Sequence, residues 1–212
     1  MIRFSLFGIP IQIQPWFWIT LAIISGRATA DTQEEILQLG LFLLAGLISI
    51  LVHELGHALT GRAFGAHSEI TLQAFGGFAA FSGARFTRPQ HFLVTAAGPL
   101  AQLLLAAAVF LAIPDLDSLT SAAGYFWKVL YWVSVVWALI NLLPVLPLDG
   151  GQMLNALLGP ARLRLTLWIT ILTACTAALL VYQSDRFHHS ILFPIFLGLF
   201  AWQAWQALRQ VR

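Results

Sequence analysis

The segment LISILVHELGHALTGR, residues 47–62, places two histidines and one glutamate in a strongly apolar run. His53 and His57 are four residues apart, so on an α-helix their side chains lie one turn apart on the same face. Two imidazoles at this spacing can bind one Zn²⁺, and the H-E-x-x-H pattern is typical of helical zinc sites. Glu54 lies beside that face, where its carboxylate can accept a proton from a water that the metal activates. The segment therefore predicts a zinc centre built on one helix.

The composition indicates that this helix lies in a lipid bilayer. The 212 residues are 59% hydrophobic and only 9% charged, whereas roughly a quarter of the residues of a soluble domain are charged. These proportions exclude an ordinary soluble domain, a disordered chain and a disulfide scaffold. Ionisable groups inside a membrane helix are costly and usually functional. We therefore interpret the His-Glu-His cluster as a functional site rather than as polar helix packing.

Six apolar segments are candidates for membrane-spanning helices. They are residues 14–28, 36–62, 92–113, 124–143, 163–182 and 190–208. Most approach the roughly 20 residues that cross about 30 Å of hydrocarbon, and the first is the shortest. We expect a single membrane-embedded domain, residues 1–212, with the fold of an all-α polytopic membrane protein. It would contain six transmembrane helices and short membrane-associated β-strands.

The predicted strands fall in two stretches outside these spans. Residues 2–13, IRFSLFGIPIQI, are rich in β-formers and partly alternate between apolar and polar side chains. Residues 68–86 contain two short β-like runs around Gly76 and Gly77. Both stretches are predicted to form strands near the membrane surface. The alternative for the glycine pair, that it is only a hairpin turn, remains open.

Basic residues are distributed unevenly between the two sides of the predicted membrane protein. One side carries eight, namely Arg3, Arg62, Arg85, Arg88, Arg162, Arg164, Arg209 and Arg212. The other side carries three, namely Arg27, Lys128 and Arg186. Basic residues concentrate on the cytoplasmic side of membrane proteins. The asymmetry therefore predicts an integral membrane protein with both termini in the cytoplasm.

A third zinc ligand is expected from a second segment. Two histidines and a water leave a tetrahedral zinc one ligand short. Asp149, in NLLPVLPLDGG at residues 141–151, is the best candidate, because the fourth span ends there at the same membrane face as His57. The two prolines interrupt a regular helix, so an extended segment could return toward the zinc. In the alternative interpretation Asp149 caps the next helix and the glycines form a turn; the pairing with the first motif favours a ligand.

The ordered set of motifs resembles the site-2 protease family of intramembrane zinc metalloproteases. HELGH in an apolar helix is followed by NLLPVLPLDGG, and TAAGPLAQ at residues 95–102 resembles the family's A-G-P segment at the start of its third helix. Residues 2–13 and GGFAAF at residues 76–81 resemble two membrane-surface strands of the family. The resemblance implies a compact six-helix core. Because no PDZ-sized insertion follows the second span and no CBS-like domain follows the sixth, we expect a minimal core.

The resemblance also implies an activity and a cofactor. The family cleaves a peptide bond within or near the transmembrane segment of a membrane-tethered protein, commonly an anti-sigma factor or a pro-sigma factor. We accordingly expect regulated intramembrane proteolysis in a prokaryotic cell membrane. One zinc ion per chain would be held by His53, His57 and Asp149, with Glu54 as the general base.

Other residues are expected to contact the substrate. Asn141 resembles the family's asparagine on helix four and would donate a hydrogen bond to the oxyanion or orient the peptide; an interhelical hydrogen bond is the alternative. A helical substrate must unwind before attack, and an edge strand can hold it extended by β-augmentation. Gly76, Gly77 and Phe78 are the candidates for that strand, and a plain surface hairpin is the alternative.

Two other classes of protein also place histidines and carboxylates in membrane helices. A non-proteolytic membrane metal-binding or transport protein would usually carry several such helices, yet the third, fifth and sixth spans are almost free of ionisable groups. A non-catalytic family member would usually have lost Glu54 or a ligand. We therefore expect a zinc metalloendopeptidase whose partners are the lipid bilayer and a membrane-spanning substrate, and no nucleic acid.

Overall fold

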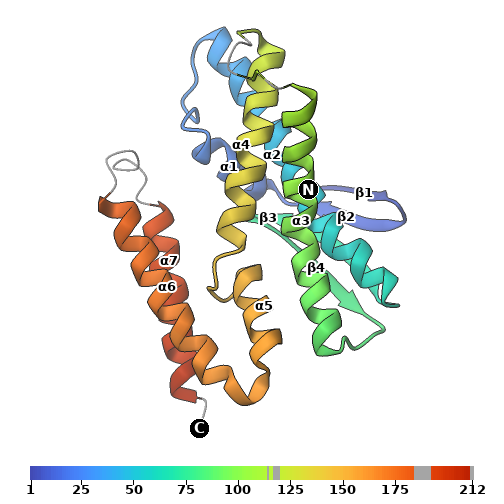
Figure 1. The fold of residues 1–212 in the computed structure, drawn as a ribbon. Helices are drawn as coiled ribbons and strands as arrows, with labels where there is room; N and C mark the ends of the chain where they lie inside the picture. The colour runs from blue at the N-terminus through green and yellow to red at the C-terminus, as the bar shows by residue number, and fades with distance from the viewer. Residues whose placement is uncertain (114, 117–119, 184–191, 211–212) are drawn as a thin grey trace. The chain divides into compact units, whose positions relative to one another are not determined.

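The structure, a computed structural model, describes residues 1–113, 115–116, 120–183 and 192–210 (Figure 1). Its strands are β1 (Ile2–Leu6), β2 (Ile9–Ile13), β3 (His67–Gln73) and β4 (Gly76–Ser82). Its helices are α1 (Pro15–Ile24), α2 (Gln33–Ala63), α3 (Arg88–Ala112), α4 (Ala122–Asn141), α5 (Asp149–Leu158), the 3₁₀ helix η1 (Pro160–Arg162), α6 (Leu163–Gln183) and α7 (Leu192–Gln210). These elements belong to two compact units: Met1–Phe86 with Ala97–Leu139, and Thr87–Ala96 with Ile140–Arg212.

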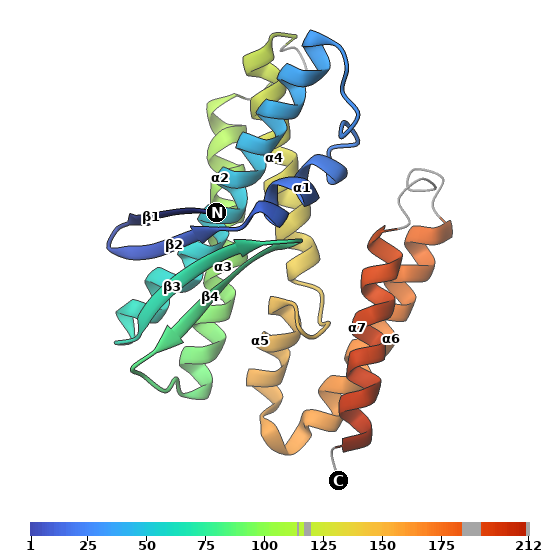
Figure 2. The same ribbon diagram turned by 180° about the vertical axis from the view of Figure 1, so that it is seen from behind.

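The four strands of the first unit form one sheet in the order β1-β2-β3-β4 (Figure 2). The β1–β2 hairpin turns at Phe7 and Gly8, whose φ angles of 52° and 73° are those of a tight two-residue hairpin turn. Strands β2 and β3 pair in parallel, with α1 and α2 between them in the chain. Strand β4 pairs antiparallel with β3 and forms one edge of the sheet. The strands predicted in both stretches are confirmed.

The turn between β3 and β4 corrects one alternative from the sequence. Residues 74 and 75 form the turn, Phe75 has a φ of 62°, and β4 begins at Gly76. Gly77 pairs with Leu72 inside the ladder. The interpretation of Gly76 and Gly77 as the hairpin turn was therefore wrong. Glycine is needed at position 77 because the strand there lies directly against side chains, as described below for Glu54.

The sheet packs on helix α2 through one apolar face. In β2 the side chains alternate, with Ile9, Ile11 and Ile13 buried. They join Phe17 and Leu21 of α1 and residues of α2 and β3 in one hydrophobic cluster, whose α2 and β3 members are Ile50, Leu55, Ala58, Ile70 and Leu72. Strict alternation is what a strand with one buried face requires. This packing fixes the sheet against the part of α2 that carries the histidines.

Helix α2 is a long helix with a well-defined start. The Thr32 hydroxyl accepts a hydrogen bond from the Glu35 N–H at 3.2 Å, and the Glu35 carboxylate accepts one from the Thr32 N–H at 3.3 Å. This reciprocal capping box satisfies two of the N–H groups that a helix start leaves open. From Ala45 onward α2 packs with α3 and α4, through Val109 and Leu130 among others. The three helices run side by side in both views (Figures 1 and 2).

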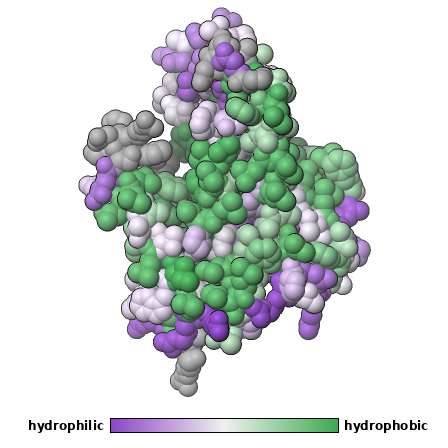
Figure 3. Space-filling model, in the orientation of Figure 1, coloured by the Kyte–Doolittle hydropathy of each residue, from purple (hydrophilic) through white to green (hydrophobic). Residues whose placement is uncertain are grey.

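Four helical segments among the described residues are long and apolar enough to cross a membrane: Gln33–Ala63, Arg88–Ala112, Ala122–Asn141 and Pro160–Gln183. Hydrophobic residues cover the middle of α3 and α4 on the face in Figure 3, and hydrophilic residues gather where α4 begins. Together these features fit an integral membrane protein. Helix α1 has only ten residues and spans about 15 Å. The predicted sixth span begins at Ser190, which lies outside the described residues, as do Arg186 and Arg212 of the charge count. The number of six spans therefore stays a prediction.

The second unit is built on the helix pair α6 and α7, which lie side by side (Figures 1 and 2). Ala174 of α6 and Leu197 of α7 are buried in one cluster with Val145 from the segment before α5. Helix α5 ends at Gly159, whose φ of 80° suits glycine. The Arg88 guanidinium donates hydrogen bonds to the carbonyls of Ala156 and Leu157. The carbonyl groups of the last turn of α5 are thus hydrogen-bonded to a positively charged side chain, which stabilises that end of the helix.

Candidate metal centre

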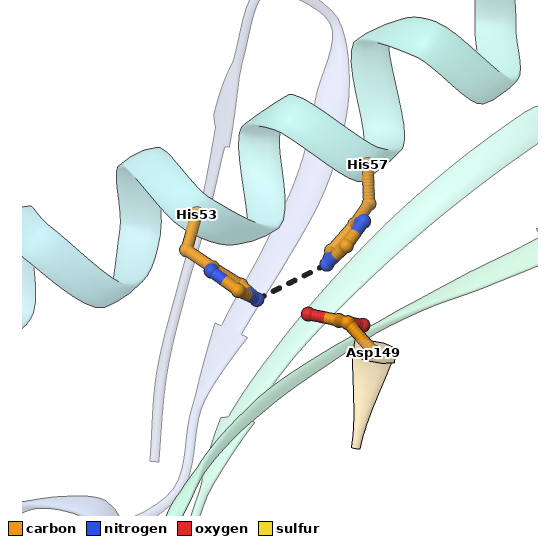
Figure 4. A group of neighbouring side chains, drawn as sticks. All are labelled: His53, His57 and Asp149. Carbon is orange, nitrogen blue, oxygen red and sulfur yellow. Dashed lines mark hydrogen bonds between the residues drawn. The ribbon is translucent and has the colours of Figure 1, made fainter. Parts of the chain in front are cut away.

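The two histidines of the H-E-x-x-H motif point to a common position. Both lie on α2, and only 3% of His53 and 8% of His57 is exposed. Their Nε2 atoms are 3.1 Å apart, and the two rings are nearly perpendicular (Figure 4). Two imidazoles bound to one tetrahedral zinc at 2.0–2.1 Å hold their nitrogens about 3.3 Å apart. The spacing of the two Nε2 atoms therefore fits a shared zinc ion.

The side chain of Glu54, a residue of α2, lies against the edge strand of the sheet, β4. Its side chain is 4% exposed. A Cβ added to Gly77 of β4 would lie 2.8 Å from Glu54 Cγ and 2.9 Å from Glu54 Oε1. Because real Cβ atoms do not approach so closely, only glycine lets the β4 backbone pass this near to the carboxylate. The structure thus brings one of the predicted strand residues to the predicted base.

Helix α3 borders the histidines with a second glycine. A Cβ on Gly98 would overlap the ring of His57 at Nε2, Cε1 and Cδ2. Next to His57 in the sequence, a Cβ on Gly56 of α2 would overlap the Ala97 carbonyl of α3. The two helices therefore approach closely at the motif, and the missing side chain at Gly98 leaves room for the His57 imidazole. The sequence had pointed to residues 95–102 only through a resemblance.

Asp149 is the first residue of α5 and is 8% exposed. The N-cap of that helix is Leu148, without a side-chain cap, so the interpretation of Asp149 as the capping residue was wrong. Gly150 and Gly151 lie inside α5 rather than in a turn. A Cβ at either position would overlap the backbone of the preceding segment, at Leu142 for the first glycine. This close backbone packing explains why glycines follow the aspartate.

One possible ligand atom on each of His53, His57 and Asp149 lies within 4.8 Å of the other two (Figure 4). Two imidazole nitrogens and one carboxylate oxygen are the donors that catalytic zinc sites use, and such sites keep a fourth position open. The residues present therefore fit a zinc ion.

The remaining predicted site residues are Asn141, Gly76 and Phe78. Asn141 is the last residue of α4 and is half-buried. Phe78 is 45% exposed on β4, and Gly76 begins that strand beside Trp137. Their roles toward a substrate stay predictions.

Sequence reasoning missed the polar residues that surround His53. Gln102 of α3 and Ser49 of α2 are fully buried and connected to it by hydrogen bonds. A signal was present, because Gly98 and Gln102 are four residues apart and thus share a face of a largely apolar helix. Without knowing which helix that face packs against, the sequence could not connect it with His53.

Comparison with known proteins places these features in a family. Two overlapping matches to the model of Peptidase family M50 cover residues 41–114 and 111–181. The Synechocystis protein sll0528 is 34% identical over 167 residues, which are 72% of this chain and 42% of that protein. Zinc metalloprotease MJ0392 of Methanocaldococcus jannaschii is 29% identical over 160 residues, covering 74% of this chain and 44% of that protein. The chain thus spans less than half the length of these relatives.

The fold has a counterpart among solved structures. The site-2 protease from Methanocaldococcus jannaschii matches with a TM-score of 0.66 and 22% identity, covering 100% of this chain and 96% of that chain. The likeness supports the arrangement of helices and strands described above. Because the family model matches more than half of this chain, the chain belongs to Peptidase family M50.

Proposed function

We propose that the protein is an intramembrane zinc metalloprotease that hydrolyses a peptide bond within or near a transmembrane segment of a membrane-tethered substrate. The observation that carries this proposal is the pair His53 and His57, with converging Nε2 atoms, beside a buried Glu54 on an apolar helix. Asp149 contributes the third ligand. When bound, zinc supplies Lewis-acid activation of a water and of the scissile carbonyl.

Glu54 is the general base in this mechanism. Its carboxylate takes the proton from the attacking water and passes it to the leaving amine. It is buried and packed against β4, so it is held in place and shielded from bulk water. Asn141 donates a hydrogen bond to the carbonyl oxygen as negative charge develops there. Neutral His53 and His57 and ionised Asp149 hold the metal.

Strand β4 is the proposed binding site for the unwound substrate. It forms one edge of the four-stranded sheet, and its Gly77 packs against Glu54. A substrate strand pairing with Gly76, Gly77 and Phe78 would therefore run next to the base. Backbone pairing at a sheet edge is indifferent to side chains, which suits an enzyme that must hold an unwound helix extended. We propose a membrane-spanning regulator, such as an anti-sigma factor or a pro-sigma factor, as the substrate.

The same proposal includes the placement of the chain. Residues 1–212 would act as one membrane-embedded metalloprotease domain, a view supported by a family match that runs through both compact units. The chain would cross a prokaryotic cell membrane six times, as the sequence predicts, with both termini in the cytoplasm. The excess of basic residues on that side supports this orientation.

The replacement Glu54→Gln tests the proposal. It keeps the shape of the side chain and removes the base. Because Glu54 is not a proposed ligand, zinc should stay bound. Cleavage of a membrane-embedded single-span substrate should fall by about 10²- to 10⁴-fold, the usual contribution of general-base assistance. Zinc stoichiometry by elemental analysis and cleavage in proteoliposomes are measured together.

Two further variants sharpen this experiment. Glu69→Gln makes the same change at an exposed carboxylate of β3 and should leave cleavage and zinc unchanged. Asp149→Ala should lose both zinc and cleavage. Near-normal cleavage by Glu54→Gln would refute the mechanism, and a wild-type protein that binds zinc but cleaves no single-span substrate would favour the metal-binding or transport alternative.

A further inference from the structure

A chain of buried polar side chains leads from His53 across three helices. His53 Nδ1 is 3.1 Å from Gln102 Oε1 on α3. Gln102 Nε2 donates to the Ser49 hydroxyl of α2 at 2.7 Å, and that hydroxyl is 2.9 Å from the Ser134 hydroxyl of α4. Ser49, Gln102 and Ser134 are all 0% exposed. Buried polar groups are costly unless they are hydrogen-bonded, and here each has a partner in the chain.

The direction of the Gln102 amide follows from its neighbours. Its Nε2 also lies 3.4 Å from the Ser49 backbone carbonyl, which can only accept a hydrogen bond. A flipped amide would place its oxygen against that carbonyl oxygen, which is repulsive. The amide oxygen therefore faces His53 and the NH₂ group faces Ser49. Because an amide oxygen can only accept, the hydrogen bond to His53 requires a proton on Nδ1.

A neutral imidazole carries one ring proton. If that proton is on Nδ1, the lone pair is on Nε2, and Nε2 is the atom of His53 that lies 3.1 Å from His57 Nε2 (Figure 4). We propose that Gln102 is a positioning residue of the metal centre, which holds His53 in the Nδ1-protonated tautomer and so keeps Nε2 ready to bind zinc.

This inference rests on the proposed zinc site and adds a residue that acts through His53. Zinc-bound histidines usually donate their second N–H to an acceptor, and loss of that acceptor typically weakens metal binding by 10–100-fold. The competing role is structural, because the same chain joins α2, α3 and α4. The two roles predict different effects of replacing Gln102 and Ser134. Of these two residues, Gln102 is the one hydrogen-bonded to His53, whereas both residues link helices.

The test compares three variants of the whole protein in detergent. Gln102→Met keeps the side-chain size and removes the acceptor, and it should raise the zinc Kd about 10–100-fold. Gln102→Glu retains an oxygen that can accept from His53 whether or not the carboxyl is protonated, so it should restore tight binding. Ser134→Ala removes the hydrogen bond farthest from His53, the one between Ser49 and Ser134, and should leave the zinc Kd unchanged. The melting temperature of each metal-free variant reports helix packing separately.

A second measurement is independent of the metal. In ¹⁵N-histidine-labelled, metal-free protein, the His53 ring should be protonated at Nδ1 in the wild type and shift toward the Nε2-protonated form in Gln102→Met. A folded Gln102→Met with wild-type zinc affinity and tautomer would overturn the proposal, and so would equal zinc weakening by Gln102→Met and Ser134→Ala. If the wild type bound no zinc, the proposed function would fail, while the tautomer would still decide the role of Gln102.

Discussion

Gly98 sets the distance between α3 and the His57 imidazole. Its missing side chain leaves the space that the ring occupies, since a Cβ there would overlap Nε2 itself. The ring is buried between helices and cannot move aside without leaving the position it shares with His53. A single methyl group at this position would therefore displace the imidazole that is proposed as a zinc ligand.

The replacement Gly98→Ala is expected to raise the zinc Kd about 10- to 100-fold, because overpacking of a buried site costs about 1–3 kcal/mol. Zinc titration against a competing chelator measures it. Gly40→Ala is the matched control, since a Cβ at Gly40 of α2 meets nothing within 4 Å. If both variants bound zinc like the wild type, the inference that Gly98 packs too closely on His57 to admit a methyl group would be wrong.

The residues of the motif could be predicted because their geometry is local. Helical periodicity alone places His53 and His57 on one face, and the structure agrees. Gln102 and Gly98 could not be predicted in the same way. Their importance depends on which face of α3 packs against α2, and a largely apolar helix carries little information about its neighbours.

Among the elements, β4 is the strand that reaches Glu54, the proposed general base. Gly77 lies inside the ladder, paired with Leu72, and its Cα faces Glu54 at a distance that admits no side chain. The atoms that a Cβ would meet belong to the flexible side chains of Leu72 and Glu54. An alanine at this position can therefore be accommodated by the fold, but only by displacing the carboxylate or its neighbour.

We expect Gly77→Ala to separate metal binding from catalysis. The zinc Kd should be unchanged, because the atoms nearest to a Cβ at this position belong to Leu72 and Glu54 rather than to the histidines. Cleavage should fall about a hundredfold, which a 1 Å misplacement of a catalytic group can cause. Ser82→Ala, an exposed position of the same strand, is the control and should cleave normally. Loss of zinc in Gly77→Ala would contradict the view that β4 positions Glu54 without affecting metal binding by the histidines of α2.

The bounds of the helices show which elements the hydropathy pattern of the sequence could predict and which it could not. The long apolar runs predicted α2, α3, α4 and α6 closely, because length and hydropathy define a spanning helix. No helix was predicted over residues 149–158, since Gly150 and Gly151 are typical of turns and were given that role in the alternative interpretation of Asp149. They occur in a helix here because the preceding backbone packs against them. That contact depends on tertiary structure and leaves no trace in local propensity.

The orientation of the chain in the membrane depends on charge rather than on packing. Helix α3 has 25 residues and is long enough to cross the bilayer at 1.5 Å per residue. Arg85 and Arg88 lie at its start, and Asp115 follows its end. Basic residues favour the cytoplasmic side. The start of α3 should therefore face the cytoplasm, which is also the side proposed for both termini.

Cysteine labelling in a Cys175→Ala background tests this orientation. Ser82→Cys lies before α3 and Thr120→Cys after it, and both positions are exposed in the described part of the chain. In intact bacterial spheroplasts an impermeant maleimide should label Thr120→Cys only, because the bilayer shields the cytoplasmic side. Ser82→Cys should react after permeabilisation, and both should react in detergent, which controls for accessibility. Labelling of both positions from outside would mean that α3 does not span the membrane, and labelling of Ser82→Cys alone would reverse the orientation and put the proposed active site on the opposite side.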